Sequence, residues 1–141
     1  MKTKLDYTLI INRSTADVFT WLTDFSKWSQ WAKGLASMEQ ASADPLDVGS
    51  IVREVWWGAR PTQSQIWEIT HFVPNQLLGM KTSDRDVSAN GTFKLVAVDT
   101  ATQLIVEFEI HTTGLLGIIN VIAKLTAKQQ LNTLRALIEA G

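Results

Sequence analysis

The sequence predicts an α+β protein in which a curved antiparallel sheet wraps around a long C-terminal helix. Three observations support this prediction. The elements follow a β-α-α-β6-α order, the six consecutive strands have short connections, and the stretch from Gly114 to Gly141 contains no proline. Short connections favour an antiparallel meander, and its apolar face needs a long element to cover it. With 141 residues, the chain has the size of one domain, residues 1–141, and can bury about two thirds of its unfolded surface.

Composition argues against several classes of function. The 13 basic and 14 acidic residues nearly cancel, and no basic stripe suggests binding to nucleic acid. With no cysteine and only two histidines, we expect no disulfide, metal or cofactor. The N-terminus has scattered charges rather than a secretion signal. The longest apolar run, Leu115 to Ile119, is far shorter than the ~20 residues of a transmembrane segment. We therefore expect a cytoplasmic protein.

The N-terminal part predicts one strand and one capped helix. Residues 4–12 are rich in β-branched and aromatic residues, which favours a strand. Ser14 then has the chemistry of a helix N-cap, and Asp17 lies three residues later, as in an acidic variant of the capping box. A short helix over residues 15–24 follows from these signals.

A pair of tryptophans marks a second short helix. Trp28 and Trp31 are three residues apart within residues 25–31, and Gly34 ends the segment. We interpret the two indoles as core side chains that wedge the helices against the sheet, since aromatic residues at helical spacing are usually core. Direct contact with a ligand is the alternative interpretation.

Six further strands are expected after Gly34, each bounded by turn residues. The strands are predicted near residues 35–42, 50–57, 63–72, 77–83, 91–98 and 103–112. The turns are predicted at residues 44–49, 58–61, 73–76, 84–91, which include Asn90-Gly91, and 99–102. The last strand alternates most clearly, with Leu104, Val106, Phe108 and Ile110 on one face and Glu107, Glu109 and His111 on the other. One face of the sheet is therefore expected to contact water.

The C-terminal helix has two apolar stripes at helical spacing. The first consists of Leu116, Ile119, Ala123, Ala127, Leu134 and Ile138. Because Ala123 and Ala127 are small, they leave room for a ligand of the size that common pockets hold. Alternatively, bulky opposing side chains such as Trp56, Trp57 or Trp67 fill that space.

The second stripe lies on the opposite side of the helix and consists of Ile118, Val121, Ile122 and Leu125. One explanation is a break, with residues 126–129 capping a new helix. The other is a continuous helix whose second stripe is covered by a loop, a second subunit or a membrane surface. We favour continuity because threonine within a helix costs only a few tenths of a kcal/mol. A continuous helix predicts a homodimer.

Four segments, in order along the chain, resemble a known superfamily. They are STADVFTWLTDFSKWSQW, PLDVGSIVRE, WEITHFVPNQLL and GTFKLVAVD. Together with the long C-terminal helix they resemble the helix-grip (START-like, or SRPBCC) superfamily, which includes START lipid-transfer domains, birch-pollen-allergen-like proteins and polyketide cyclase/dehydrase proteins. The resemblance covers essentially the whole chain. It implies a helix-grip fold with a deep cavity for a hydrophobic ligand, and it provides no universal catalytic residue.

Strand alternation indicates which side chains face this cavity. If Glu68 and Lys94 point outward, their neighbours on the two strands point toward the helix. The expected ligand-binding residues are Trp56, Trp67, Ile69, Phe93, Leu95, Phe108, Ile119, Ala123 and Ala127. Residues 50–57 mix apolar and charged groups on both faces, so either Arg53 or Glu54 can point inward as a polar cavity group.

The simpler interpretation of Arg53 and Glu54, which we favour, is a charge at a solvated strand end or sheet edge. The histidines, His71 and His111, are expected on the surface, because one lies near a turn and the other alternates with glutamates. No residue is assigned a catalytic role.

These expectations lead to one function and two alternatives. The first is binding or transport of a small hydrophobic ligand, such as a lipid, a polyketide or an aromatic compound, between the sheet and the C-terminal helix. The second is a cyclase or dehydratase in which a cavity acid such as Glu54 moves protons. The third is an interaction module that holds an apolar segment of a partner.

Overall fold

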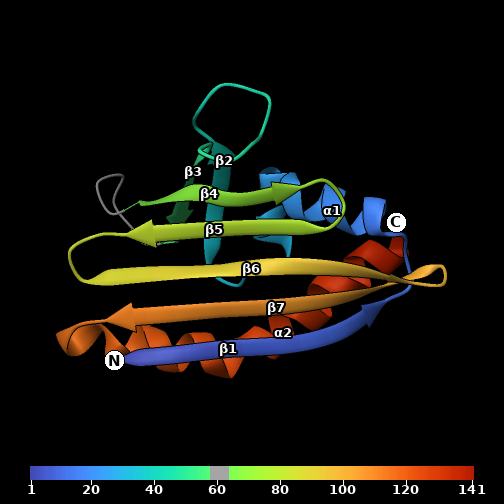
Figure 1. The fold of residues 1–141 in the computed structure, drawn as a ribbon. Coiled ribbons are helices and arrows are strands. Elements are labelled where there is room, and N and C mark those ends of the chain that lie inside the picture. Colours follow the sequence, from blue (N-terminus) through green and yellow to red (C-terminus); the bar gives the residue numbers. More distant parts are fainter. Residues whose placement is uncertain (58–63) are drawn as a thin grey trace.

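The computed structural model of the protein describes residues 1–57 and 64–141. Within them seven strands form one antiparallel sheet in the order β1-β7-β6-β5-β4-β3-β2 (Figure 1). The strands are β1 (Lys2–Ile11), β2 (Leu35–Gln40), β3 (Ile51–Trp56), β4 (Gln65–Val73), β5 (Leu77–Ser83), β6 (Val87–Val98) and β7 (Ala101–Thr112). The helical segments are α1 (Thr15–Thr23), η1 (Phe25–Gln30), η3 (Gly114–Leu116) and α2 (Gly117–Ala140), where η marks a 3-10 helix.

The predicted fold is confirmed. Strands β2 to β7 pair in sequence as a meander, and β1 pairs with β7 along its whole length, from Lys2 opposite His111 to Ile11 opposite Thr102. Figure 1 shows α2 running beneath β1 and β7, with α1 near its C-terminal end. Apart from β6, the predicted strands differ from the observed ones by no more than two residues at either end. The turn predicted at residues 58–61 lies outside the described residues.

Strand β6 begins earlier than predicted, because Asn90 and Gly91 lie within the strand rather than in a turn. Gly91 is directly opposite Phe108 of β7. A Cβ atom on Gly91 would overlap the Phe108 ring and the Glu107 carbonyl oxygen. This glycine therefore permits a close approach of the Phe108 ring. The turn between β5 and β6 instead follows Asp84, whose carboxylate accepts the Val87 N–H at 3.0 Å.

The helix cap and the tryptophan pair match their predictions. Ser14 accepts the Asp17 N–H at 3.2 Å and so caps α1. The second short helix is a 3-10 helix, η1, and it places Trp28 in the core, where its indole N–H donates to the Leu22 carbonyl at 2.9 Å. Trp31 directly follows η1, and its ring centroid is 4.7 Å from that of Trp28. Both indoles are buried and therefore join the short helices to the sheet.

Helix α2 is continuous, as expected. Thr126 lies inside it, and its hydroxyl donates to the Ile122 carbonyl at 2.8 Å instead of capping a new helix. The predicted inward stripe is correct for Leu134 and Ile138, which are buried. It is wrong at its N-terminal end, because Ile119 is exposed and Asn120 is buried in its place.

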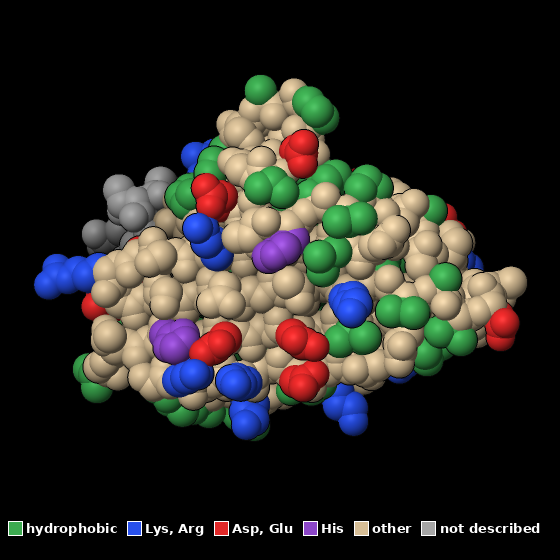
Figure 2. Space-filling model, viewed as in Figure 1, with side chains coloured by type: hydrophobic (Ala, Val, Ile, Leu, Met, Phe, Trp, Pro, Cys, Tyr) green, Lys and Arg blue, Asp and Glu red, His purple; other side chains and the backbone are tan. Residues whose placement is uncertain are grey.

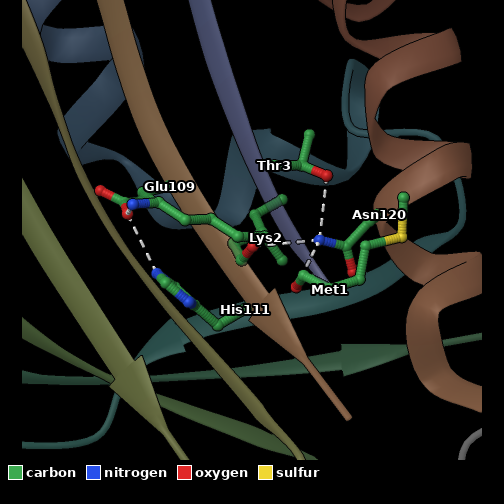
Figure 3. A network of polar contacts seen from close by, with 7 residues as sticks. Met1, Lys2, Thr3, Glu109, His111 and Asn120 are labelled. Atoms are coloured by element: carbon green, nitrogen blue, oxygen red, sulfur yellow. Dashed lines mark hydrogen bonds and ion pairs between the residues drawn. The ribbon is translucent and has the colours of Figure 1, made fainter. Parts of the chain in front are cut away.

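Asn120 anchors the first turn of α2 to β1 and β7 (Figure 3). Its amide nitrogen donates to the Thr3 hydroxyl at 3.1 Å, to the Ile110 carbonyl at 3.0 Å and to the Met1 carbonyl at 3.3 Å. Its amide oxygen accepts the Thr112 hydroxyl. Asn120 therefore occupies the buried position and Ile119 the exposed one. A buried amide is costly when unpaired, and here both the nitrogen and the oxygen of the amide have hydrogen-bond partners.

The face of the sheet that points away from α2 carries acidic, basic and histidine side chains (Figure 2). Glu109 of β7 pairs with Lys2 at 2.8 Å and contacts His111 at 3.1 Å. The hydrogen bond from Lys2 is the main reason that the pKa of Glu109 lies below its usual value. His71 and His111 are both exposed, as the sequence predicts. No helix among the described residues is long and apolar enough to cross a membrane.

Candidate functional site

An apolar cavity of about 190 Å³ lies between the sheet, the segment of η1 and Trp31, and the middle of α2. Seven of its lining residues are aromatic. The cavity is lined by Leu5, Tyr7, Trp28, Trp31, Ala32, Leu35, Met38, Glu54, Trp56, Trp67, Met80, Phe93, Val106, Phe108, Ala127, Gln130 and Leu131. The wall therefore combines side chains that are far apart in sequence, and among the residues that the structure describes Glu54 is its one carboxylic acid.

Most of the predicted site residues on the strands reach this cavity. Trp56, Trp67, Phe93 and Phe108 line it, as expected from the alternation of their strands. That these side chains contact a ligand stays a prediction. The other two strand residues of the set, Ile69 and Leu95, are buried in the core but do not line the cavity.

The predicted helix residues divide differently. Ala127 lines the cavity, whereas Ile119 and Ala123 do not, and the two other contributions of α2 come from Gln130 and Leu131. The cavity therefore faces the middle of α2 rather than its N-terminal turns. The reason is that Asn120 fixes the N-terminal half against the edge formed by β1 and β7, so only the following turns face the space below η1.

Large aromatic side chains form the cavity wall without filling its interior. The Phe93 ring packs against Phe108 with centroids 5.2 Å apart and against Trp28 at 5.7 Å, while Trp67 packs edge-on against Phe108 at 6.4 Å. Such tilted contacts are favourable and hold the rings in place. Trp57, which we considered as a filler, is 77% exposed. The interpretation of Trp28 and Trp31 as core is correct and incomplete, because both also line the cavity.

Strand β3 settles the choice between Arg53 and Glu54. Arg53 points to the outer face and pairs with Glu39 of β2. Glu54 is buried and lines the cavity together with Trp56. The expectation of a solvated charge is thus correct for Arg53 and wrong for Glu54. Local alternation could not decide this, because each face of β3 carries both apolar and charged residues. The pairing of β3 with β2 and β4 determines that Val52 and Glu54 are the residues that face inward.

The environment of Glu54 favours its neutral form. Burial raises the pKa of this carboxyl, while the indole N–H groups of Trp67 and Trp56 act in the opposite direction. Trp56 Nε1 donates to Glu54 Oε1 at 3.1 Å. The Trp67 indole lies near the carboxyl, although its Nε1 falls outside hydrogen-bond geometry and has no partner within residues 1–57 and 64–141. Among these residues no lysine, arginine or histidine forms an ion pair with Glu54.

A curved antiparallel sheet and a long C-terminal helix that enclose an apolar cavity define a helix-grip protein. The chain belongs to the family described as polyketide cyclase / dehydrase and lipid transport, whose model matches residues 2–139. No sequence relative was found among curated proteins. The family and the cavity together support a ligand-binding or cyclase role.

Three solved structures of low sequence identity share the fold. The Zhui aromatase/cyclase from Streptomyces sp. R1128 is 14% identical with a TM-score of 0.74, and the alignment covers 99% of this chain and 94% of that one. Ara h 8.0201 is 12% identical with a TM-score of 0.73 and complete coverage of both chains. TTHA0849 from Thermus thermophilus is 12% identical with a TM-score of 0.76, and 98% of each chain is covered.

The described residues contain no group of three or more histidine, aspartate or glutamate side chains placed to hold a metal ion. The polar groups of the cavity wall include Glu54, with the indole N–H of Trp56 bound to it, and the hydroxyl of Tyr7 and the amide of Gln130 elsewhere in the wall. These groups can donate and accept hydrogen bonds, and the acid can transfer a proton.

Proposed function

We propose that the protein binds a small hydrophobic molecule in the cavity between the sheet and α2. The main support is the cavity itself, whose wall is aromatic and aliphatic except for the Tyr7 hydroxyl, Gln130, Glu54 and the indole N–H groups of its tryptophans. Its volume of about 190 Å³ indicates a compact ligand, since an apolar cavity of roughly 150 Å³ holds benzene. An aromatic compound of one or two rings, or a short segment of a lipid or polyketide, fits this space. A partner's apolar segment needs more room, so the interaction module is not proposed.

Filling the cavity at Ala127 is expected to weaken ligand binding. Ala127→Phe places a ring where α2 faces the cavity, so the affinity for a neutral probe such as naphthalen-2-ylmethanol should fall by at least about tenfold, equivalent to about 1.4 kcal/mol. Isothermal titration calorimetry measures the affinity. Native mass spectrometry of protein purified from cells should also show loss of any copurified ligand.

Ala136→Phe is the matched control, because Ala136 lies on the exposed side of the same helix. It should bind the probe like the wild type, and both variants should remain folded by circular dichroism. Equal affinity of Ala127→Phe and the wild type would place any binding site elsewhere.

The second candidate function is that of a cyclase or dehydratase, and the burial of Glu54 in the cavity favours it. A carboxyl with a raised pKa retains its proton at higher pH than a surface glutamate, and can therefore serve as a general acid. A Glu54→Gln variant that binds a polyketide substrate normally and no longer converts it would support this function. Undiminished conversion by that variant would rule out Glu54 as the acid.

An exposed apolar face on η3 and the first half of α2 supports our prediction of a homodimer. The face consists of Leu115, Leu116, Ile118, Ile119, Val121, Ile122 and Leu125. No described loop covers it, and Leu125 is 77% exposed. Contiguous apolar surface of this kind is typical of interaction sites. We expect sedimentation to show a dimer at micromolar concentration and Leu125→Asp to weaken it by at least about tenfold, because the dimer would have to bury the new charge.

Val98→Asp is the control for the dimer, since Val98 is an exposed apolar residue at the end of β6, at the β6–β7 hairpin. It should leave the association constant unchanged. A wild-type protein that is monomeric at all concentrations would contradict the prediction.

A further inference from the structure

The charge of the cavity wall indicates a more specific class of ligand than hydrophobic molecules in general. Among the described lining residues one is acidic, Glu54, and none is basic, while seven are aromatic. We propose that the ligand is a compact aromatic or aliphatic amine, cationic at neutral pH, whose ammonium group contacts Glu54 and the surrounding rings. This inference rests on the proposed function of the cavity.

The first argument is charge pairing. Glu54 is 7% exposed and has no ion-pair partner among the described residues. A buried carboxylate without a partner is unfavourable, and an ammonium ion supplied by a ligand would compensate it. A carboxylate ligand such as a fatty acid would instead bring a second negative charge into a space that holds no described cation. Binding of an acid beside Glu54 would require one of the two carboxyl groups to stay protonated, which disfavours this class of ligand relative to an amine.

The second argument is the hydrogen-bonding geometry at the carboxyl. Trp56 Nε1 donates to Oε1 of Glu54 at 3.1 Å. The other oxygen, Oε2, accepts no hydrogen bond from residues 1–57 or 64–141. The Trp56 bond orients the carboxyl, and Oε2 is left as the acceptor for a ligand N–H. Binding of an ammonium group there adds a charge-assisted hydrogen bond.

The third argument is the aromatic wall. Four of the lining residues are tryptophans, of which Trp56 and Trp67 lie beside Glu54. The face of an indole attracts cations more strongly than other rings do, by about 0.5 to 2 kcal/mol depending on solvation. A neutral ligand of the same shape would gain burial of apolar surface but not this attraction. The combination of one acid and several indoles therefore selects for a cation.

Three naphthalene compounds of nearly equal size test the inference by calorimetry at pH 7: naphthalen-2-ylmethylamine, naphthalen-2-ylmethanol and 2-naphthoate. The amine should bind at least about tenfold more tightly than the alcohol, which is about 1.4 kcal/mol, and the carboxylate should bind most weakly. In Glu54→Gln the preference for the amine over the alcohol should fall below about threefold, or roughly 0.65 kcal/mol.

Glu39→Gln is the matched control, because Glu39 is an exposed acid on β2 that pairs with Arg53 on the outer face. It should keep the full preference for the amine. Equal binding of all three compounds, or an undiminished preference in Glu54→Gln, would overturn the inference while leaving a hydrophobic binding site in place. Failure of all three to bind would count against the proposed function itself, and the inference would fall with it.

Discussion

Replacing Asn120 with alanine is expected to lower the free energy of unfolding by about 2 to 3 kcal/mol. The substitution removes the acceptor of the Thr112 hydroxyl and the donor to the Thr3 hydroxyl, and both threonines are buried. Each buried polar group left without a partner costs about 1 to 3 kcal/mol. The Met1 carbonyl contributes less to the loss, because it also accepts the Thr112 N–H at 2.9 Å. Urea denaturation measures the change.

The effect should be concentrated in the first half of α2. Asn120 is the one residue there that is fully buried, whereas Leu131, Leu134 and Ile138 hold the second half. Amide hydrogens around residues 120–125 should therefore exchange faster in the variant, while those near Leu134 change little.

Asn132→Ala provides the control for this experiment. Asn132 is an exposed asparagine on the same helix whose side chain accepts a hydrogen bond from Arg135 at 2.9 Å. Its replacement should change the free energy of unfolding by less than about 0.5 kcal/mol. A similar small change for Asn120→Ala would show that the buried network does not stabilise the fold.

Replacing Glu54 with glutamine is expected to stabilise the ligand-free protein at pH 7 by about 1 to 3 kcal/mol, the range that mutational data give for an uncompensated buried polar group. Burial raises the pKa of Glu54 in the folded state above its value in the unfolded chain. The unfolded chain therefore loses this proton at lower pH than the folded protein does, and the carboxyl disfavours folding as the pH rises. Glutamine keeps the size and the acceptor for Trp56 and removes the charge.

The sign of the pH dependence follows from the raised pKa. Below the ordinary glutamate pKa of about 4.5, the carboxyl is neutral in both states, and the wild type and Glu54→Gln should be about equally stable. The difference should grow as the pH rises from there through the pKa of the folded state, and then stay constant. Each unit of pKa shift corresponds to about 1.36 kcal/mol. Denaturation curves between pH 4 and pH 9 measure this.

Glu39→Gln again serves as the reference, since this exposed acid is not buried on folding. Its effect on stability should be small and should not grow over the same pH range as that of Glu54→Gln. A Glu54→Gln variant that is less stable than the wild type at pH 7 would indicate that Glu54 is stabilised as a carboxylate in the ligand-free protein.

Local signals accounted for most of the fold. The alternation of Leu104, Val106 and Phe108 with charged residues predicted β7, and Ser14 with Asp17 predicted the start of α1. These features depend on neighbours in the sequence, so periodicity and capping chemistry are enough to recognise them. The short connections then implied the meander, which the sheet order confirms.

The predictions that failed depended on contacts between distant residues. Asn90-Gly91 has the composition of a turn, but Gly91 meets Phe108 across the sheet and belongs to β6. Ile119 has the hydrophobicity of a core residue, but Asn120 takes the inward position because its partners lie on β1 and β7. A single asparagine within the apolar run GIINVIAKL was the signal that could have revealed this anchor, since such a residue needs buried partners.

The order and spacing of residues along the chain were enough to predict the class of fold and the continuity of α2. They also predicted most of the aromatic residues that line the cavity. Tertiary contacts were needed to establish where along α2 the cavity lies and which charged residue of β3 faces it. The reason is that Arg53 and Glu54 sit on alternate faces of one strand, and each face also carries apolar residues. Pairing of β3 with β2 gave Arg53 an outer partner in Glu39 and left Glu54 inside, where burial raises its pKa.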